Sequence, residues 1–387
     1  MDSSRDRDRK PSVLFIYLSR EFGEDEQLAL EDIFELNMQG LNWRVICLAG
    51  TPIHDRLIQF GKKKVIVLEQ TPKELFDREF KRMIKSQVAE GVNLIHSFGS
   101  DYLGSILPWM LGMPNIPVVV SEGPHVQKSM RHLIQSFFYA RIDALLVPSV
   151  ALRRRIQAMR PALSNKVRVV HPGLDFNIFN PDHFDFTVLR KKWGIEPDFH
   201  VVGMIASREY KKAQSAFIKA AASFLRNEEL AKRTKFIIVG FEHEGNEELI
   251  ELIRQFHLQE QIILAPAEES IPKVLGTLDV YVLPSSKAMF GLQAIESLAM
   301  ATPIIVASGP DSSEWIGNSQ GGLLMRSGDS FDLQRKLRMI LEDPSELKIM
   351  GKRAVQFVRE NYDRTARTAR LFEIYERVLR RRNDVRK

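Results

Sequence analysis

The sequence has one cysteine, Cys47, among 387 residues. A single thiol excludes an internal disulfide and any metal site built from cysteines alone, which suits a reducing compartment. No uninterrupted apolar run reaches the length that crosses a bilayer, and the first ten residues, MDSSRDRDRK, lack the apolar core of a secretory signal. We therefore expect a cytoplasmic protein.

The common metal and phosphate-loop motifs are also missing. The sequence contains no HExxH, no paired-cysteine pattern and no Gly-x-x-x-x-Gly-Lys-Ser/Thr loop. We accordingly expect no metal ion and no resident cofactor.

What is present is an ordinary globular composition with a basic balance. Hydrophobic residues make up 44% and charged residues 27%, and the length suffices for two domains of common size. The formal net charge is +6. A basic balance favours an acidic partner such as a nucleotide, a nucleic acid or an anionic lipid, without choosing among them, and it also fits a merely solvated surface.

Short apolar runs alternate with amphipathic stretches along most of the chain, which predicts parallel α/β sheets. In the first half we expect strands at residues 13–18, 43–49, 64–68, 93–96, 116–121, 142–149 and 166–170. In the second half we expect strands at residues 201–205, 235–240, 261–264, 278–283 and 304–307. Pro172 and Gly173 end the first series, so the two halves read as two domains.

The stretch 283–305, LPSSKAMFGLQAIESLAMATPII, joins a predicted strand to a helix that begins near Phe290. Free backbone N–H groups at Gly291 and Leu292, together with the helix dipole, would attract phosphate there. Glu296 follows on the same helix and could accept hydrogen bonds from a pair of hydroxyls, as on a ribose. The bland alternative is an ordinary strand, turn and packed helix.

This stretch resembles the nucleotide-sugar signature of family 4 glycosyltransferases of the GT-B fold, which is roughly PSxxExFGxxxxEAxAxGxPV. The match takes in Pro284, Ser285, Phe290, Gly291, Glu296, Ala299 and Pro303. The first glutamate of the signature is replaced by Ala288, which removes a partner for the hydroxyls of the donor sugar.

The resemblance implies two Rossmann-like domains that face each other across a cleft, with a C-terminal helix that crosses back to the first domain. We expect an N-terminal, acceptor-side domain over residues 11–180, completed by 364–387. The nucleotide-sugar-binding domain would then span residues 181–363.

The resemblance also implies a donor site in the second domain. Glu296 would hold the ribose, and the diphosphate would lie on the amides of Gly291 and Leu292. The other expected donor-binding residues are Ser285, Phe290, Arg208, Lys211 and Lys212. Met204 stands at the usual arginine position of the family, so the cations Arg208 and Lys211 would come from the loop that follows.

Catalytic candidates in the first domain are His96, Glu122 and His125. His96 fits the first histidine of the family's strand-end HxH region, and Phe98 occupies the second. The family often has a sugar-facing histidine after the strand at 116–121. Gly123 stands there, preceded by Glu122, so His125 could substitute if the loop turns it inward. Packed or solvent-facing histidines fit the same positions.

The loop after the first strand departs from the family as well. Of the usual Gly-Gly pair only Gly23 remains, and it is followed by Glu24, Asp25 and Glu26. These carboxylates would repel a diphosphate at close range.

The reading favoured by these residues is a metal-independent, retaining glycosyltransferase that moves a sugar from a nucleotide diphosphate sugar to a glycan or lipid-linked acceptor. The alternative is a catalytically silent GT-B protein that binds a nucleotide as a sensor or scaffold. A sugar-nucleotide epimerase is a weaker third reading. We expect a nucleotide sugar and no nucleic acid as partner.

Basic segments raise the further expectation of peripheral binding to the inner, anionic face of a membrane. Arg153, Arg154 and Arg155 lie on one predicted helix, and the end of the chain, RVLRRRNDVRK, carries six basic residues. Both segments also fit solvated helix faces.

Overall fold

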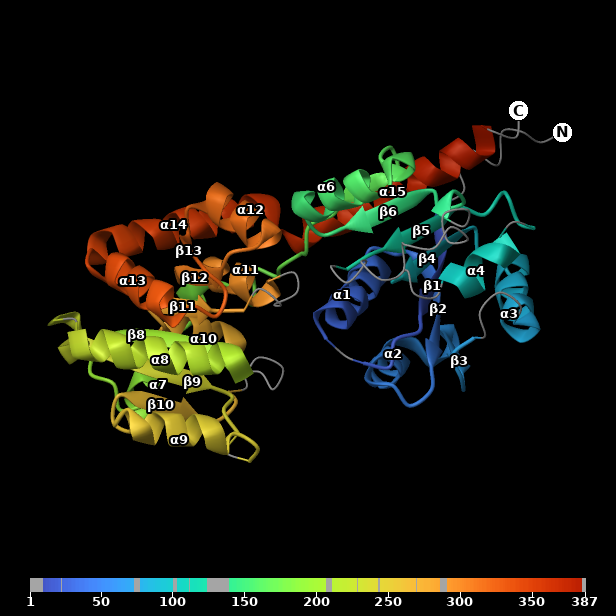
Figure 1. The fold of residues 1–387 in the computed structure, drawn as a ribbon. Coiled ribbons are helices and arrows are strands. Elements are labelled where there is room, and N and C mark those ends of the chain that lie inside the picture. The colour runs from blue at the N-terminus through green and yellow to red at the C-terminus, as the bar shows by residue number, and fades with distance from the viewer. Residues whose placement is uncertain are drawn as a thin grey trace. The chain divides into compact units, whose positions relative to one another are not determined.

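The computed structural model describes residues 10–21, 23–72, 77–99, 103–110, 112–123, 139–206, 211–227, 229–242, 244–268, 270–285 and 291–384. The chain forms two compact units (Figure 1). Unit 1 comprises Met1–Gly173 and Arg364–Lys387, and unit 2 comprises Leu174–Asp363. The boundaries expected from the sequence follow residues 180 and 363.

Unit 1 is built on a seven-stranded parallel sheet with the order β3-β2-β1-β4-β5-β6-β7. The strands are β1 (Ser12–Tyr17), β2 (Asn42–Leu48), β3 (Val65–Leu68), β4 (Leu94–Phe98), β5 (Val118–Ser121), β6 (Ala144–Val147) and β7 (Val167–Val169). Their side chains are buried on both faces at the centre of the sheet, which is why the strands appear in the sequence as continuous apolar runs.

Helices cover both faces of this sheet. One face packs against α1 (Glu24–Met38), α2 (Pro52–Gly61) and α15 (Arg364–Asp384). The other packs against α3 (Arg78–Ala89), α4 (Leu103–Met110) and α6 (Val150–Met159). The last helix of the chain, α15, therefore belongs to unit 1, as the sequence predicted.

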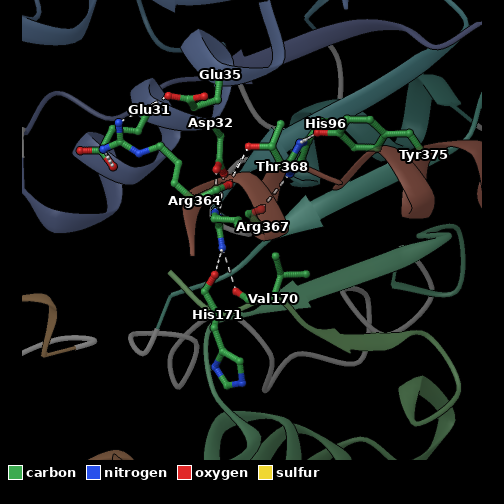
Figure 2. Close-up of polar contacts among 11 residues, drawn as sticks. Glu31, Asp32, Glu35, His96, Val170, His171, Arg364, Arg367, Thr368 and Tyr375 are labelled. Atoms are coloured by element: carbon green, nitrogen blue, oxygen red, sulfur yellow. Dashed lines mark hydrogen bonds and ion pairs between the residues drawn. The ribbon is translucent and has the colours of Figure 1, made fainter. Parts of the chain in front are cut away.

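A buried ion pair joins α15 to α1 (Figure 2). The guanidinium of Arg367 donates from Nε and Nη2 to the two carboxylate oxygens of Asp32, at 2.6 and 2.7 Å. Its Nη1 donates to the carbonyl oxygens of Val170 and His171, where the chain leaves unit 1. Arg364 adds ion pairs to Glu31 and Glu35. This network fixes both α15 and the exit of the chain to α1.

Unit 2 has a six-stranded parallel sheet with the order β10-β9-β8-β11-β12-β13. The strands are β8 (His200–Ile205), β9 (Thr234–Val239), β10 (Ile262–Ala265), β11 (Val280–Leu283), β12 (Ile304–Ala307) and β13 (Gly322–Met325). One face packs against α7 (Thr187–Lys192), α10 (Ile271–Thr277), α11 (Leu292–Ala299), α12 (Pro310–Ser319) and α14 (Pro344–Asn361). The other packs against α8 (Lys211–Asn227), α9 (Glu247–Gln255) and α13 (Ser330–Leu341).

Two parallel sheets, each covered by helices, confirm the predicted GT-B architecture of two Rossmann-like domains. Helix α1 begins at Glu24, because Gly23 is its N-cap and the Glu26 carboxylate accepts a hydrogen bond from the Gly23 amide. The acidic run thus forms the first turn of a helix, where the dipole favours negative charge. Residues 128–140, between two of the predicted strands, lie almost entirely outside the described residues.

Candidate functional site

In unit 2 the residues predicted to bind the donor come from two neighbouring strands. β8 lies between β9 and β11, and the chain passes from β8 through α8 to β9. The order of the strands therefore reverses between β8 and β11, and open α/β sheets bind ligands at such a point, beyond the carboxyl ends of the strands. Lys211 and Lys212 begin α8, and Ser285 follows β11. The topology thus brings these predicted residues to one edge of the sheet.

Gly291 begins the helix at this edge, and two features demand glycine there. Its φ of 59° and ψ of 40° are left-handed, a conformation that glycine adopts without strain. A Cβ on Gly291 would also collide with the Trp315 ring of α12. The indole therefore packs directly against the backbone at the start of α11.

The first turn of α11 presents backbone donors. The carbonyl of Gly291 accepts the first helical hydrogen bond, from the amide of Ile295 at 3.0 Å. The amides of Leu292, Gln293 and Ala294 precede that bond and have no carbonyl partner within the helix, and Gly291 has no side chain that could cap them. Three donors at the positive end of a buried helix suit an anion.

Glu296 lies in the second turn of the same helix and is only 7% exposed. Gln293, one turn earlier, accepts a hydrogen bond from the Tyr281 hydroxyl of β11 at 2.8 Å. Helix α11 is thus tied both to its own strand and, through Trp315, to α12. These contacts help to position the start of the helix.

The two described cations of the predicted donor site differ. Both lysines are exposed, but only the Lys211 ammonium has a recorded hydrogen bond, which it donates to the carbonyl of Gly245 in the segment after β9. Arg208 and Phe290 lie outside the described residues, as does Ala288. Their assignments, like those of the other donor-binding residues, stay predictions.

In unit 1 His96 lies in the middle of β4, and not at a strand end as predicted, with its ring completely buried (Figure 2). Its Nδ1 is 2.7 Å from the Tyr375 hydroxyl of α15, and its Nε2 is 2.8 Å from Oγ of Ser121. Burial, and next the charge of Arg367, lower the pKa of His96 to about 3. Both ring nitrogens are occupied within the protein, so this geometry favours a packing role over the predicted proton transfer.

Glu122 and Gly123 follow β5 at the same edge. The Glu122 side chain is 8% exposed, and its amide donates to the carbonyl of Leu146. A Cβ on Gly123 would lie 2.5 Å from Oδ2 of Asp25, so the Asp25 carboxyl fills the space that a side chain at position 123 would need. His125, the third catalytic candidate, lies outside the described residues.

Sequence reasoning overlooked three residues that shape these two edges. Trp315 and Gln293 fix the start of α11, and no pattern in the sequence marks either one. Asp25 belongs to the acidic run after the first strand. Its signal in the sequence is its position just after a buried strand, since such residues stand at the ligand-binding edge of a parallel sheet.

Two searches of the described residues bear on other kinds of site. No group of three or more histidine, cysteine, aspartate or glutamate side chains in these ranges could hold a metal ion. Within the same part of the chain, no helix combines the length and apolarity that crossing a membrane requires.

Sequence comparison connects unit 2 with a known family. Residues 185–357 match the family described as "Glycosyl transferases group 1". A D-inositol 3-phosphate glycosyltransferase of Nocardia farcinica is 27% identical over 241 residues, which are 61% of this chain and 53% of that protein. Its counterpart in Thermobispora bispora is 26% identical over 270 residues, 68% of this chain and 62% of that protein. The chain thus spans between about half and two thirds of the length of these relatives.

Solved structures match nearly the whole chain. A glycosyltransferase from Rickettsia africae superposes with a TM-score of 0.82 at 16% identity, covering 96% of this chain and 99% of that one. Anabaena Alr3699/HepE, crystallised with UDP, superposes with a TM-score of 0.78 at 18% identity, covering 94% and 98%. At such identities the likeness concerns the fold. Residues 185–357 therefore resemble a glycosyl transferases group 1 domain, and the chain as a whole has the GT-B fold.

Proposed function

We propose that the protein is a retaining glycosyltransferase that transfers a sugar from a nucleotide diphosphate sugar to a glycan or glycolipid acceptor. The donor would bind at the edge of unit 2 where β8 and β11 end. The leaving diphosphate would be stabilised there by the start of α11 and by the cations that follow β8, which requires no metal.

The observation that carries this proposal is the start of α11. At the switch point of the sheet, a left-handed glycine packed on Trp315 precedes three backbone amides that have no carbonyl partner within the helix, and Glu296 follows within the same helix. Amides and a dipole bind phosphate, and a carboxylate accepts hydrogen bonds from ribose hydroxyls. One short helix thus offers complementary groups to the two ends of a nucleoside diphosphate.

The first test is a calorimetric titration with nucleotide sugars, read together with release of nucleoside diphosphate. UDP-glucose is the first donor to try, because HepE has been crystallised with UDP-glucose. D-inositol 3-phosphate is the first acceptor, because the curated relatives are named for it. We expect one sugar nucleotide to bind and to turn over in the presence of an acceptor.

Glu296→Ala should weaken that binding by roughly tenfold or more, since it removes a charged hydrogen-bond acceptor. Glu251→Ala is the matched control, because Glu251 is an exposed glutamate of α9 in the same unit. Nucleotide binding without turnover on any acceptor would support the silent sensor or scaffold instead, and no binding of any nucleotide would contradict both readings.

Peripheral membrane binding is a second part of the proposal, and the structure supports a surface other than the arginine-rich segments. Arginines of α15 already pair with carboxylates: Arg370 and Arg377 with Glu373, Arg380 with Glu376, and Arg382 with Asp143. The α1–α2 surface instead combines exposed apolar side chains with lysines. It consists of Phe34, Met38, Phe60, Lys62 and Lys63.

Phe34 and Phe60 lie with their ring centroids 5.1 Å apart, and both are more than a third exposed. Aromatic rings beside lysines suit the headgroup region of an anionic membrane. A flotation assay with vesicles of mixed neutral and anionic lipid tests this. Binding should require the anionic lipid and should fall when Phe60 and Lys63 are both replaced by Ser. Equal flotation of that variant and the wild type would contradict the assignment.

A further inference from the structure

A cluster of arginines lies along β7, which is the last strand in the order of the unit 1 sheet and pairs with β6. Val167 and Val169 pack on the face of the sheet that α6 covers, whereas Val170 packs on the opposite face together with α15. Because side chains alternate between the two faces of a strand, Arg168 points to the α15 face. A cation thus stands on the edge strand of the sheet, on the side of the last helix.

Helix α15 runs along β6 and β7 on this face. Near its start Arg367 donates a hydrogen bond to the carbonyl of Val170, just after β7 (Figure 2). Near its end Arg382 donates to the carboxylate of Asp143, just before β6, at 2.7 Å. Between these two anchors, apolar side chains of the helix share a core cluster with β6. The helix therefore passes beside the strand that carries Arg168.

Three arginines form a stripe on one side of α15. The spacing of Arg370, Arg377 and Arg381 brings them to the same side of an α-helix, over a length of roughly 16 Å. Arg370 and Arg377 share one carboxylate, that of Glu373. Arg381 is exposed, and in the part of the chain that the structure describes it forms no ion pair. The stripe is therefore short of negative charge.

Arg168 feels this stripe directly. Burial lowers the pKa of Arg168, and the positive charges of Arg381, Arg377 and Arg370 lower it further, in that order. Its guanidinium donates to the neutral carbonyl of Val167 at 3.0 Å, and among the described residues no carboxylate pairs with it. Arginine keeps its proton under such conditions, so the repulsion remains as a cost to the stability of unit 1. An anion bound from outside the chain would relieve it.

Phosphate is the anion that fits this cluster best. Guanidinium groups are planar and donate parallel pairs of hydrogen bonds to phosphate oxygens. A phosphate monoester or a diphosphate also carries more negative charge than a single carboxylate. Because Arg168 is half-buried, its attraction to such a group is screened less by salt than that of a fully exposed arginine.

We propose that Arg168, Arg377 and Arg381 form a binding site for a phosphate group on the β7 side of unit 1, with Arg370 adding charge at one end. The phosphate is that of a soluble monoester or diphosphate, or that of a lipid headgroup. The site lies within unit 1 and involves no residue of the donor site, so the inference does not depend on the proposed glycosyl transfer.

The first test is a calorimetric titration of the full-length protein with inorganic pyrophosphate, in a buffer of low ionic strength without phosphate. Arg168→Met and Arg381→Met should each weaken the binding at this site by about tenfold or more, since each removes a charged hydrogen-bond donor. Arg380→Met is the matched control, because Arg380 lies in the same turn of α15 but pairs with Glu376. It should change the affinity by less than about twofold.

Equal binding by the wild type, Arg168→Met and Arg381→Met would overturn the site. Equal losses in Arg380→Met and Arg381→Met would overturn it as well, because only the overall charge would then matter. Pyrophosphate that still binds to Arg381→Met belongs to other places, such as the start of α11. A protein that turns over no sugar nucleotide but loses pyrophosphate binding in these variants would contradict the proposed function and support the site.

Melting temperatures give a second readout. Pyrophosphate should raise the melting temperature of the wild type, because it binds the folded protein, and should raise that of Arg168→Met much less. Without pyrophosphate, Arg168→Met should be at least as stable as the wild type, because the substitution removes repulsion. The same rise in both proteins would overturn the role of Arg168.

Vesicle flotation identifies the source of the phosphate. The vesicles contain phosphatidylcholine with or without phosphatidic acid, and the protein carries Phe60→Ser and Lys63→Ser so that the α1–α2 surface does not contribute. Flotation that requires phosphatidic acid and is lost in Arg381→Met would assign the site to a lipid headgroup. Pyrophosphate binding without flotation would assign it to a soluble phosphate compound, and the absence of both would overturn the proposal.

Discussion

The two sheets have the same plan and opposite chemistry at the edge where their strands end. At that edge of unit 2, α11 begins with a left-handed glycine and with amides that have no partner within the helix, and two lysines begin α8. At that edge of unit 1, α1 begins with Glu24, Asp25 and Glu26. Parallel sheets place a helix start at each such edge, but the residues of the first turn decide whether it binds phosphate. The comparison teaches that the start of α11 suits an anion better than the acidic start of α1 does.

The largest expected effect is a loss of stability in unit 1 that leaves the stability of unit 2 unchanged. Arg367→Leu leaves the Asp32 carboxylate buried without its partner, which should lower the free energy of unfolding of unit 1 by about 3–5 kcal/mol. Chemical denaturation, with hydrogen exchange in each unit as the readout, measures this loss of stability. Arg370→Ala, at an ion pair that is about half exposed, should cost under about 1 kcal/mol. Equal losses in the two variants would contradict the assigned role of the buried pair.

The next effect is a loss of nucleotide affinity when the start of α11 in unit 2 is altered. Gly291→Val adds a side chain that collides with Trp315 at a left-handed position, so the helix start must shift. Affinity for UDP should fall by about 100-fold, or about 2.7 kcal/mol. Gly194→Val is the control, because Gly194 has a φ of 66° with open space around it. It should lose stability through backbone strain while keeping its affinity. UDP affinity that survives in Gly291→Val would place the nucleotide elsewhere.

Acid should destabilise unit 1 because of its buried histidine, His96. The pKa of His96 is lowered to about 3 in the folded protein, so the unfolded chain takes up its proton first as the pH falls below about 6.5. Stability should therefore drop between about pH 6.5 and 3, by up to about 1.4 kcal/mol per pH unit. His96→Gln should flatten this slope, which denaturation at several pH values would show. If the substitution leaves the dependence of stability on pH unchanged, groups other than His96 cause the acid sensitivity.

The pH dependence of stability that Asp25 causes should have the opposite sign to that of His96. Its pKa is raised to about 7, so its contribution to stability is present below about pH 4 and is lost as the pH rises through about 7. Asp25→Asn should stabilise unit 1 at pH 8 by on the order of 1–3 kcal/mol and change little at pH 4. Thermal unfolding at the two pH values measures this. A variant that is less stable at pH 8 would mean that the carboxylate is well accommodated there.

The smallest expected effect concerns Lys212, an exposed lysine in the first turn of α8. Lys212→Ala should weaken UDP binding by roughly three- to tenfold, with a loss that shrinks at high salt, because an exposed ammonium contributes about 1 kcal/mol or less. Lys219→Ala, at an exposed lysine further along α8, is the matched control. Equal effects of the two substitutions would mean that Lys212 acts only through the overall positive charge and does not contact the nucleotide.

The fold could largely be predicted from the sequence, because buried parallel strands and amphipathic helices leave strong periodic signals. The second domain could also be recognised from the pattern around Gly291 and Glu296. What could not be predicted are contacts between distant segments. Trp315 against Gly291, Asp25 against Gly123, and His96 between Ser121 and Tyr375 each depend on three-dimensional packing. His96 shows the difference most clearly, since its position suggested chemistry and its surroundings are those of a core residue.

Hydrogen–deuterium exchange with and without UDP tests the difference between the two edges most directly. The account predicts that UDP slows exchange at the amides of Leu292, Gln293 and Ala294 in unit 2. Protection in the first turn of α1 without any at these three amides would contradict it, because the nucleotide would then lie on the acidic edge of unit 1.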